Sequence, residues 1–129
     1  MDGSVHVIGL DHIVVMSADV ERALGFYMGT LGLAGVRVDE WRRGEVPFPS
    51  VRIDVTTIID LFPGERSGEN IAHLCLTIDP VDLDQLAAGG AFDVVDGPID
   101  ALFGAQGYAR SLYVRDPDGN TVELRSYTS

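Results

Sequence analysis

The chain has 129 residues, of which 46% are hydrophobic and 22% charged, enough for one soluble domain with a sizeable core. Acidic residues outnumber basic ones 20 to 9 and the formal net charge is −11, which argues against nucleic acid and membrane partners. The single cysteine excludes an internal disulfide, no apolar run approaches the roughly 18 residues of a membrane span, and no secretion-signal pattern is present. We therefore expect a cytoplasmic protein.

The first half of the sequence predicts a strand, a helix and three more strands. Residues 5–16 are rich in β-branched side chains and alternate so that His12 lies on one face of the strand and Asp11 on the other. The next apolar residues follow helical spacing after a cap at Ser17 or Asp19, and Gly32 is the expected stop. The later strands are expected at 34–39, 50–55 and 57–62, with a loose connection at 41–49.

The second half repeats this order after a polar linker at 63–68. A strand is expected at 70–78, and Asp79-Pro80 indicates the start of a short helix that ends at Gly89-Gly90. The last strands are expected at 92–95, 111–115 and 121–126, with a turn at 116–119 and a loop at 97–107. The predicted organisation is one domain over 1–129, built from a β-α-β-β-β module at 7–63 and a second at 69–127.

A histidine and an acid occur at matching places in the two halves. His12 lies 48 positions before Asp60, and His73 lies 50 positions before Glu123. In each half the histidine falls in the first strand and the acid in the last. This repetition favours one pseudo-symmetric metal site made by both halves over two unrelated surface histidines.

His12, His73 and Glu123 are the predicted metal ligands. Two imidazoles and one carboxylate form a facial set that holds Fe(II), Mn(II), Zn(II), Ni(II) or Co(II) and leaves positions open for substrate. Asp60, the equivalent of Glu123, is predicted to contact the substrate or to serve as a further ligand. Tyr113, ten residues before Glu123, is the predicted catalytic acid, and Arg110 is a candidate for binding an anionic substrate.

Three motifs resemble the vicinal oxygen chelate superfamily of glyoxalases, bleomycin resistance proteins and extradiol dioxygenases. They are Gly9-Leu10-Asp11-His12-Ile13-Val14-Val15, the Phe26-Tyr27 pair followed by Leu31-Gly32-Leu33, and Asp116-Pro117-Asp118-Gly119-Asn120-Thr121-Val122-Glu123-Leu124. The resemblance implies an α+β fold whose two βαβββ modules form a cupped, mixed and mostly antiparallel sheet. It also implies that His12, His73 and Glu123 bind a divalent metal ion, and that the protein forms a homodimer with shared sites.

These features predict a metal-dependent lyase, isomerase, transferase or dioxygenase that binds vicinal oxygens of a small substrate. The alternative is a metal-free protein of the bleomycin resistance type that sequesters a drug. A third possibility is a regulatory or immunity protein that keeps the fold without catalysis. The complete set of three ligands favours the enzyme, because sequestration does not require them.

Overall fold

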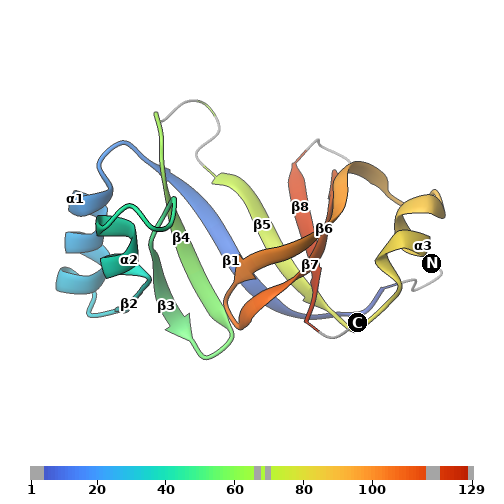
Figure 1. Cartoon of the computed structure of the whole chain (residues 1–129), viewed down its shortest axis with the longest axis horizontal. Coiled ribbons are helices and arrows are strands. Elements are labelled where there is room, and N and C mark those ends of the chain that lie inside the picture. The colour runs from blue at the N-terminus through green and yellow to red at the C-terminus, as the bar shows by residue number, and fades with distance from the viewer. Residues whose placement is uncertain (1–4, 66–67, 69–70, 116–119, 128–129) are drawn as a thin grey trace. The chain divides into compact units, whose positions relative to one another are not determined.

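The computed structural model describes residues 5–65, 68, 71–115 and 120–127, and Figure 1 shows their elements. They form two compact units. The N-terminal unit is His12–Ala72, and the C-terminal unit contains the described residues up to Asp11 and from His73 onwards. Strand β1 (Val7–Ser17) crosses this division, so that Asp11 and His12, although consecutive, belong to different units.

The N-terminal unit is a four-stranded sheet in the order β2-β3-β4-β1. Strand β4 pairs in parallel with β1, and the other pairs are antiparallel. The remaining elements of this unit are β2 (Ala34–Val36), β3 (Ser50–Asp54), β4 (Thr57–Pro63), α1 (Val20–Leu24), the π-helical η1 (Gly25–Thr30) and α2 (Val38–Arg42). Apolar side chains from both helices and the sheet make its core: Val20, Leu24, Val38, Val51 and Leu61.

The C-terminal unit has the same plan, with strand order β5-β8-β7-β6 and a parallel β5–β8 pair. Its elements are β5 (Ile71–Ile78), α3 (Leu83–Ala88), β6 (Asp93–Gly104), β7 (Gly107–Arg115) and β8 (Thr121–Ser126). Its core contains Ile78, Leu83, Leu112, Val114 and Leu124. The predicted α+β class, with a mixed and mostly antiparallel set of strands, is confirmed.

The region after β2 differs from its prediction, because a helix replaces the end of the expected strand and the start of the loose connection. Arg37 adopts a left-handed backbone conformation with φ of 59°, which ends β2 and turns the chain into α2. The helix buries Val38 and packs Trp41 against the core. Burial of these two side chains therefore overrides the β-branched pattern of the sequence.

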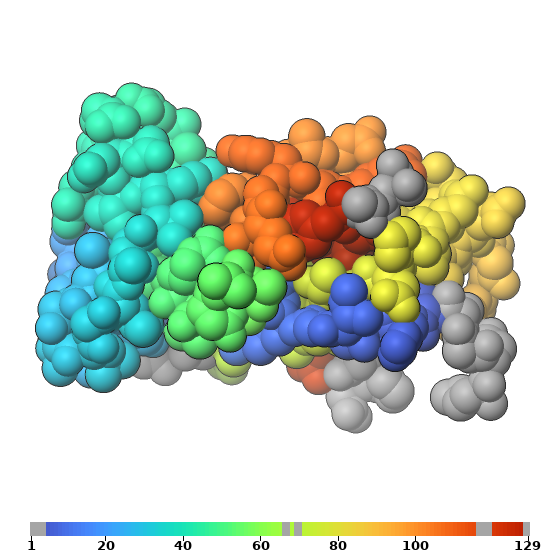
Figure 2. All heavy atoms as spheres, turned by 90° about the horizontal axis from the view of Figure 1, so that it is seen from below, coloured from blue at the N-terminus to red at the C-terminus, as the bar shows by residue number. Residues whose placement is uncertain are grey.

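Strand β3 ends at Asp54, one residue earlier than predicted. The Asp54 carboxylate accepts hydrogen bonds from the backbone N–H of Thr56 at 3.0 Å and from its hydroxyl at 3.2 Å, which closes a turn. Val55, at the tip of this turn, is 84% exposed. The space-filling view shows the region around this turn, in green, at the surface (Figure 2).

Two predictions in the C-terminal unit are also wrong. Helix α3 begins at Leu83, because the Asp82 carboxylate caps it by accepting from the backbone N–H groups of Asp84 and Gln85. Strand β6 continues to Gly104 and β7 begins at Gly107, so most of the loop expected at 97–107 is strand, and the pairing of β6 with β7 shifts register on both sides of Gly97-Pro98. The predicted turn at 116–119 and part of the predicted linker lie outside the described residues.

Among the described residues, no helix has the length and apolar character needed to cross a membrane.

Candidate metal centre

The duplication seen in the sequence is present in the strand registers. In the N-terminal unit Asp60 of β4 is paired with Val14 of β1, two residues after His12. In the C-terminal unit Glu123 of β8 is paired with Cys75 of β5, two residues after His73. Residues two apart on a strand share a face, so each histidine lies on the same face as its acid.

His73 and Glu123 form the closer of the two pairs. Nε2 of His73 lies 3.1 Å from Oε1 of Glu123. The Glu123 side chain is 1% exposed and that of His73 is 19% exposed. The pair is thus a carboxylate held inside the protein beside an imidazole that solvent can still reach.

The second carboxylate oxygen of Glu123 is held by two other residues. The hydroxyl of Ser111, on β7, donates to Oε2 at 2.6 Å. Nη1 of Arg125, two residues further along β8, donates to the same oxygen at 2.7 Å. These contacts give the two oxygens different surroundings, since Oε2 faces donors of the protein interior and Oε1 faces His73.

Tyr113 lies beside the same carboxylate, as the hairpin of β7 and β8 predicts. It is paired with Glu123 across the two strands, and its hydroxyl donates to Oε1 at 3.3 Å. Its ring also meets the His73 ring edge to face, with centroids 5.4 Å apart. Burial raises the pKa of the Tyr113 phenol well above its usual range, and the Glu123 charge raises it further, so the phenol keeps its proton.

A buried ionic network extends from Glu123 through Arg125 to Asp11. Nε of Arg125 lies 3.9 Å from Oδ2 of Asp11, and both side chains are fully buried. Asp11 also accepts from the Tyr127 hydroxyl and, at 2.9 Å, from the backbone N–H of Ala105. Burial alone would lower the pKa of Arg125, but the negative charges around it outweigh burial and raise the pKa, so Arg125 remains a cation.

The N-terminal unit contains a looser version of the His73–Glu123 pair. Nε2 of His12 lies 3.7 Å from Oδ2 of Asp60, and both side chains are 2% exposed. The hydroxyl of Ser50, on β3, donates to the other Asp60 oxygen at 2.5 Å. Both acids are therefore tied by one oxygen to a serine of the neighbouring antiparallel strand and face a histidine with the other.

The donor atoms of the C-terminal pair fit one divalent ion. Ligand nitrogen and oxygen atoms lie about 2.1 Å from an ion with octahedral coordination, so two neighbouring ligands, which meet at a right angle, are about 3.0 Å apart. The 3.1 Å between His73 Nε2 and Glu123 Oε1 matches this spacing. The 3.7 Å between His12 and Asp60 fits adjacent positions on one ion less closely. His73 and Glu123 are thus the better-formed candidate site for an ion with octahedral coordination.

Arg110, predicted to bind an anionic substrate, is engaged by two acids of its own unit. Its guanidinium pairs with Asp84 of α3 at 3.0 Å and with Asp100 of β6 at 2.6 Å. An anionic substrate would have to compete with both carboxylates. His6, the third histidine, lies outside the candidate site and pairs with Asp79 at 2.8 Å.

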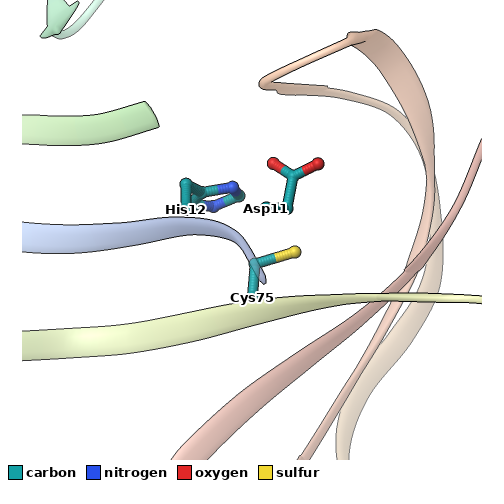
Figure 3. A group of neighbouring side chains, drawn as sticks. All are labelled: Asp11, His12 and Cys75. Carbon is teal, nitrogen blue, oxygen red and sulfur yellow. The ribbon is translucent and has the colours of Figure 1, made fainter. Parts of the chain in front are cut away.

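Cys75 is fully buried on the strand face that carries His73. A carboxylate oxygen of Asp11 lies within 4.8 Å of its sulfur. Figure 3 shows these two side chains together with His12, the residue that follows Asp11 in β1. A buried thiol in such surroundings behaves mainly as a small packed side chain, in line with its interpretation from the sequence.

Sequence reasoning did not single out Arg125, Asp11 or Ser50 as parts of the site. One signal was available for Arg125: it stands two residues after Glu123 on a strand, and hence on the same face. Gly104 supplied no sequence signal, although a Cβ there would lie 2.5 Å from Cζ of Arg125. The absence of a side chain at Gly104 makes room for the buried guanidinium.

The fold and the paired sites define a duplicated βαβββ protein with a buried carboxylate beside a histidine in each unit. Residues 9–124 match the model of the Glyoxalase/Bleomycin resistance protein/Dioxygenase superfamily, and the chain belongs to this superfamily. The family predicted from the sequence motifs is thereby confirmed.

Two sequence relatives and one solved structure illustrate the similarity. The virulence protein STM3117 of Salmonella typhimurium is 29% identical over 123 residues, covering 92% of this chain and 83% of the relative. The glyoxalase domain-containing protein RDO1 of Mycosarcoma maydis is 31% identical over 131 residues, covering 94% and 69%. The Mn(II)-bound glyoxalase of Novosphingobium aromaticivorans has a similar fold, with a TM-score of 0.71, 20% identity, and coverage of 97% of this chain and 40% of that one.

Proposed function

We propose that the protein is a divalent-metal-dependent enzyme acting on a small substrate with two neighbouring oxygens, as a lyase, isomerase, transferase or dioxygenase. His12, His73 and Glu123 hold the ion in this proposal. The observation that carries it is the distance of 3.1 Å between Nε2 of His73 and Oε1 of the buried Glu123 carboxylate. The Mn(II)-bound glyoxalase supports the choice of a divalent ion, because a protein of the same fold carries one.

The residues around Glu123 have distinct parts in this proposal. When bound, a divalent ion supplies Lewis-acid stabilisation of negative charge on a substrate oxygen. Glu123 and His73 fix where that oxygen binds, and Tyr113 holds a proton at its phenol oxygen, 3.3 Å from Glu123 Oε1. A neutral phenol in this place can donate a hydrogen bond to the substrate, whereas its raised pKa makes it a weak proton donor.

We further propose that the protein is a homodimer in which His12 of one copy joins His73 and Glu123 of the other. Both histidines are retained in the duplicated pattern, and each lies on the same sheet face as an acid of its own unit. Asp60, tied to Ser50, then lies beside the His12 ligand and contacts the substrate or the imidazole.

Metal analysis of the three histidine variants tests the enzyme proposal. Protein stripped of metal is reloaded with Fe(II), Mn(II), Zn(II), Co(II) or Ni(II), desalted and analysed by mass spectrometry. We expect about one ion per chain in the wild type, and roughly tenfold less in His12→Ala and His73→Ala, because an ion loses affinity with each ligand removed. His6→Ala is the matched control and should retain the ion.

Equal and negligible metal in the wild type and all three variants would contradict the enzyme proposal. The metal-free drug-binding alternative would then be the better explanation of the fold.

Mixing two defective variants tests the shared site. His12→Ala and His73→Ala are unfolded together in equal amounts, refolded, and assayed for bound metal. In a dimer with shared sites each mixed dimer regains one complete ligand set, so we expect clear recovery of bound metal over either variant alone. No recovery, in a protein whose wild type binds metal, would show that both histidines of a site come from one chain.

A further inference from the structure

We infer that Ser111 and Arg125 are positioning residues that hold the Glu123 carboxylate so that it offers only Oε1 to a metal ion. This inference rests on the proposed function and adds to it the mode in which the carboxylate binds. Neither residue is a ligand in the proposed site. Their effect is exerted through the second oxygen of Glu123.

The hydrogen bonds to Glu123 carry the inference. A carboxylate oxygen has about two lone-pair sites, and Oε2 already receives one donor from Ser111 at 2.6 Å and one from Arg125 at 2.7 Å. Both donors are fully buried, so water does not compete with them. Oε1 instead faces His73 at 3.1 Å and Tyr113 at 3.3 Å. Only Oε1 is oriented toward a metal-ligating histidine.

Arg125 is itself fixed in place and cannot easily release Oε2. Its second terminal nitrogen donates to the backbone carbonyl of Leu102, and its Nε lies 3.9 Å from Asp11. Its guanidinium also lies over the Tyr127 ring, 5.2 Å from the centroid. Gly104 has no side chain, and the guanidinium occupies the space that a Cβ there would take.

The equivalent carboxylate of the N-terminal unit, Asp60, has a serine donor, but no arginine stands at the position equivalent to Arg125. Asp60 receives a serine hydroxyl at 2.5 Å, as Glu123 does. The residue two positions later on β4, equivalent to Arg125, is Phe62, which has no donor to offer. Glu123, the acid that we propose as the ligand, thus has both a serine and an arginine donor on one oxygen.

Holding the carboxylate by one oxygen has a consequence for substrate binding. A carboxylate that binds an ion through both oxygens occupies two coordination positions, whereas one that binds through a single oxygen leaves a position open. A substrate that binds through two neighbouring oxygens needs two adjacent open positions. Ser111 and Arg125 would therefore preserve the site's capacity for such a substrate.

Cobalt(II) binding by Ser111→Ala and Arg125→Lys tests the inference. Cobalt affinity is measured by titration, and the visible absorption spectrum reports the coordination of the ion. We expect each variant to bind cobalt about tenfold more weakly than the wild type, with a changed spectrum, because contacts that orient a ligand are worth about 10–100-fold in affinity. Lysine keeps the positive charge, so its effect reports the lost guanidinium geometry and not the lost charge.

Ser126→Ala is the matched control, since Ser126 is a buried serine on β8 that the proposed site does not use. It should leave both the cobalt affinity and the spectrum unchanged.

A wild-type spectrum and affinity in Ser111→Ala and Arg125→Lys would overturn the inference, and so would an equal change in Ser126→Ala. If Ser111→Ala does not fold, Arg125→Lys alone decides. A wild type that binds no cobalt or other divalent ion would instead overturn the proposed function, and the inference with it.

Discussion

Replacement of Arg125 by methionine is expected to lower the free energy of unfolding of the metal-free protein by about 3–5 kcal/mol. Methionine fills much of the same volume but leaves the carboxylates of Glu123 and Asp11, which are 1% and 0% exposed, without their shared cation. A buried charge that loses its partner is costly because water cannot replace the lost contact. Urea unfolding followed by circular dichroism measures the effect.

Arg110→Met is the control for this prediction. Arg110 also pairs with two acids, but Asp84 and Asp100 are largely exposed, and such surface pairs are worth about 0–1 kcal/mol. The double variant Arg125→Met/Glu123→Gln should regain part of the loss, because one of the two uncompensated charges is removed. A loss below about 1 kcal/mol in Arg125→Met would show that the network does not stabilise the fold.

Glu123→Gln is expected to weaken metal binding by about 100-fold or more, while Asp60→Asn weakens it by less than about tenfold. Glutamine keeps the size of the side chain but removes the negative oxygen that a divalent ion requires. Asp60, the other acid of the repeat, lies 3.7 Å from its histidine and has a shorter side chain. Competition of the apo variants with a chelating dye for Zn(II) measures both affinities.

Circular dichroism of both variants controls for loss of folding, since glutamine leaves Arg125 without one of its carboxylate partners. Equal losses of affinity in Glu123→Gln and Asp60→Asn would mean that both acids are ligands. Wild-type affinity in both variants would mean that neither acid is a ligand, and Glu123 would then not belong to the proposed site.

The sequence predicted the duplicated elements well because the strongest signals were local. The apolar runs around His12 and His73 and the alternation around Glu123 each depend on a single strand. Tyr113 was placed correctly beside Glu123 because a hairpin brings together residues at a predictable separation. The family motifs then fixed the fold class, which the strand order confirms.

What the sequence did not show depends on contacts between distant segments. Asp11 was expected on the strand face opposite His12, yet both are buried, because Asp11 is satisfied by Ala105, Arg125 and Tyr127 from the far end of the chain. Ser50 was not considered before the strand registers were known, and Ser111 was considered only as a possible contact of an anionic substrate, not as a donor to Glu123. Helix α2 was missed because the burial of Val38, not local propensity, decides its conformation.

The division of β1 between the two units limits how this protein can be cut or rearranged. A fragment that begins after the linker at 63–68 would contain every residue of the second predicted module but not Asp11. Arg125 would then keep Glu123 as its buried carboxylate partner, and the Ala105 N–H and the Tyr127 hydroxyl would lose their acceptor. The amino-acid sequence reads as a tandem repeat, but Arg125 of the second copy is paired with Asp11 from the first strand of the chain. The second module therefore cannot be exchanged as a self-contained unit.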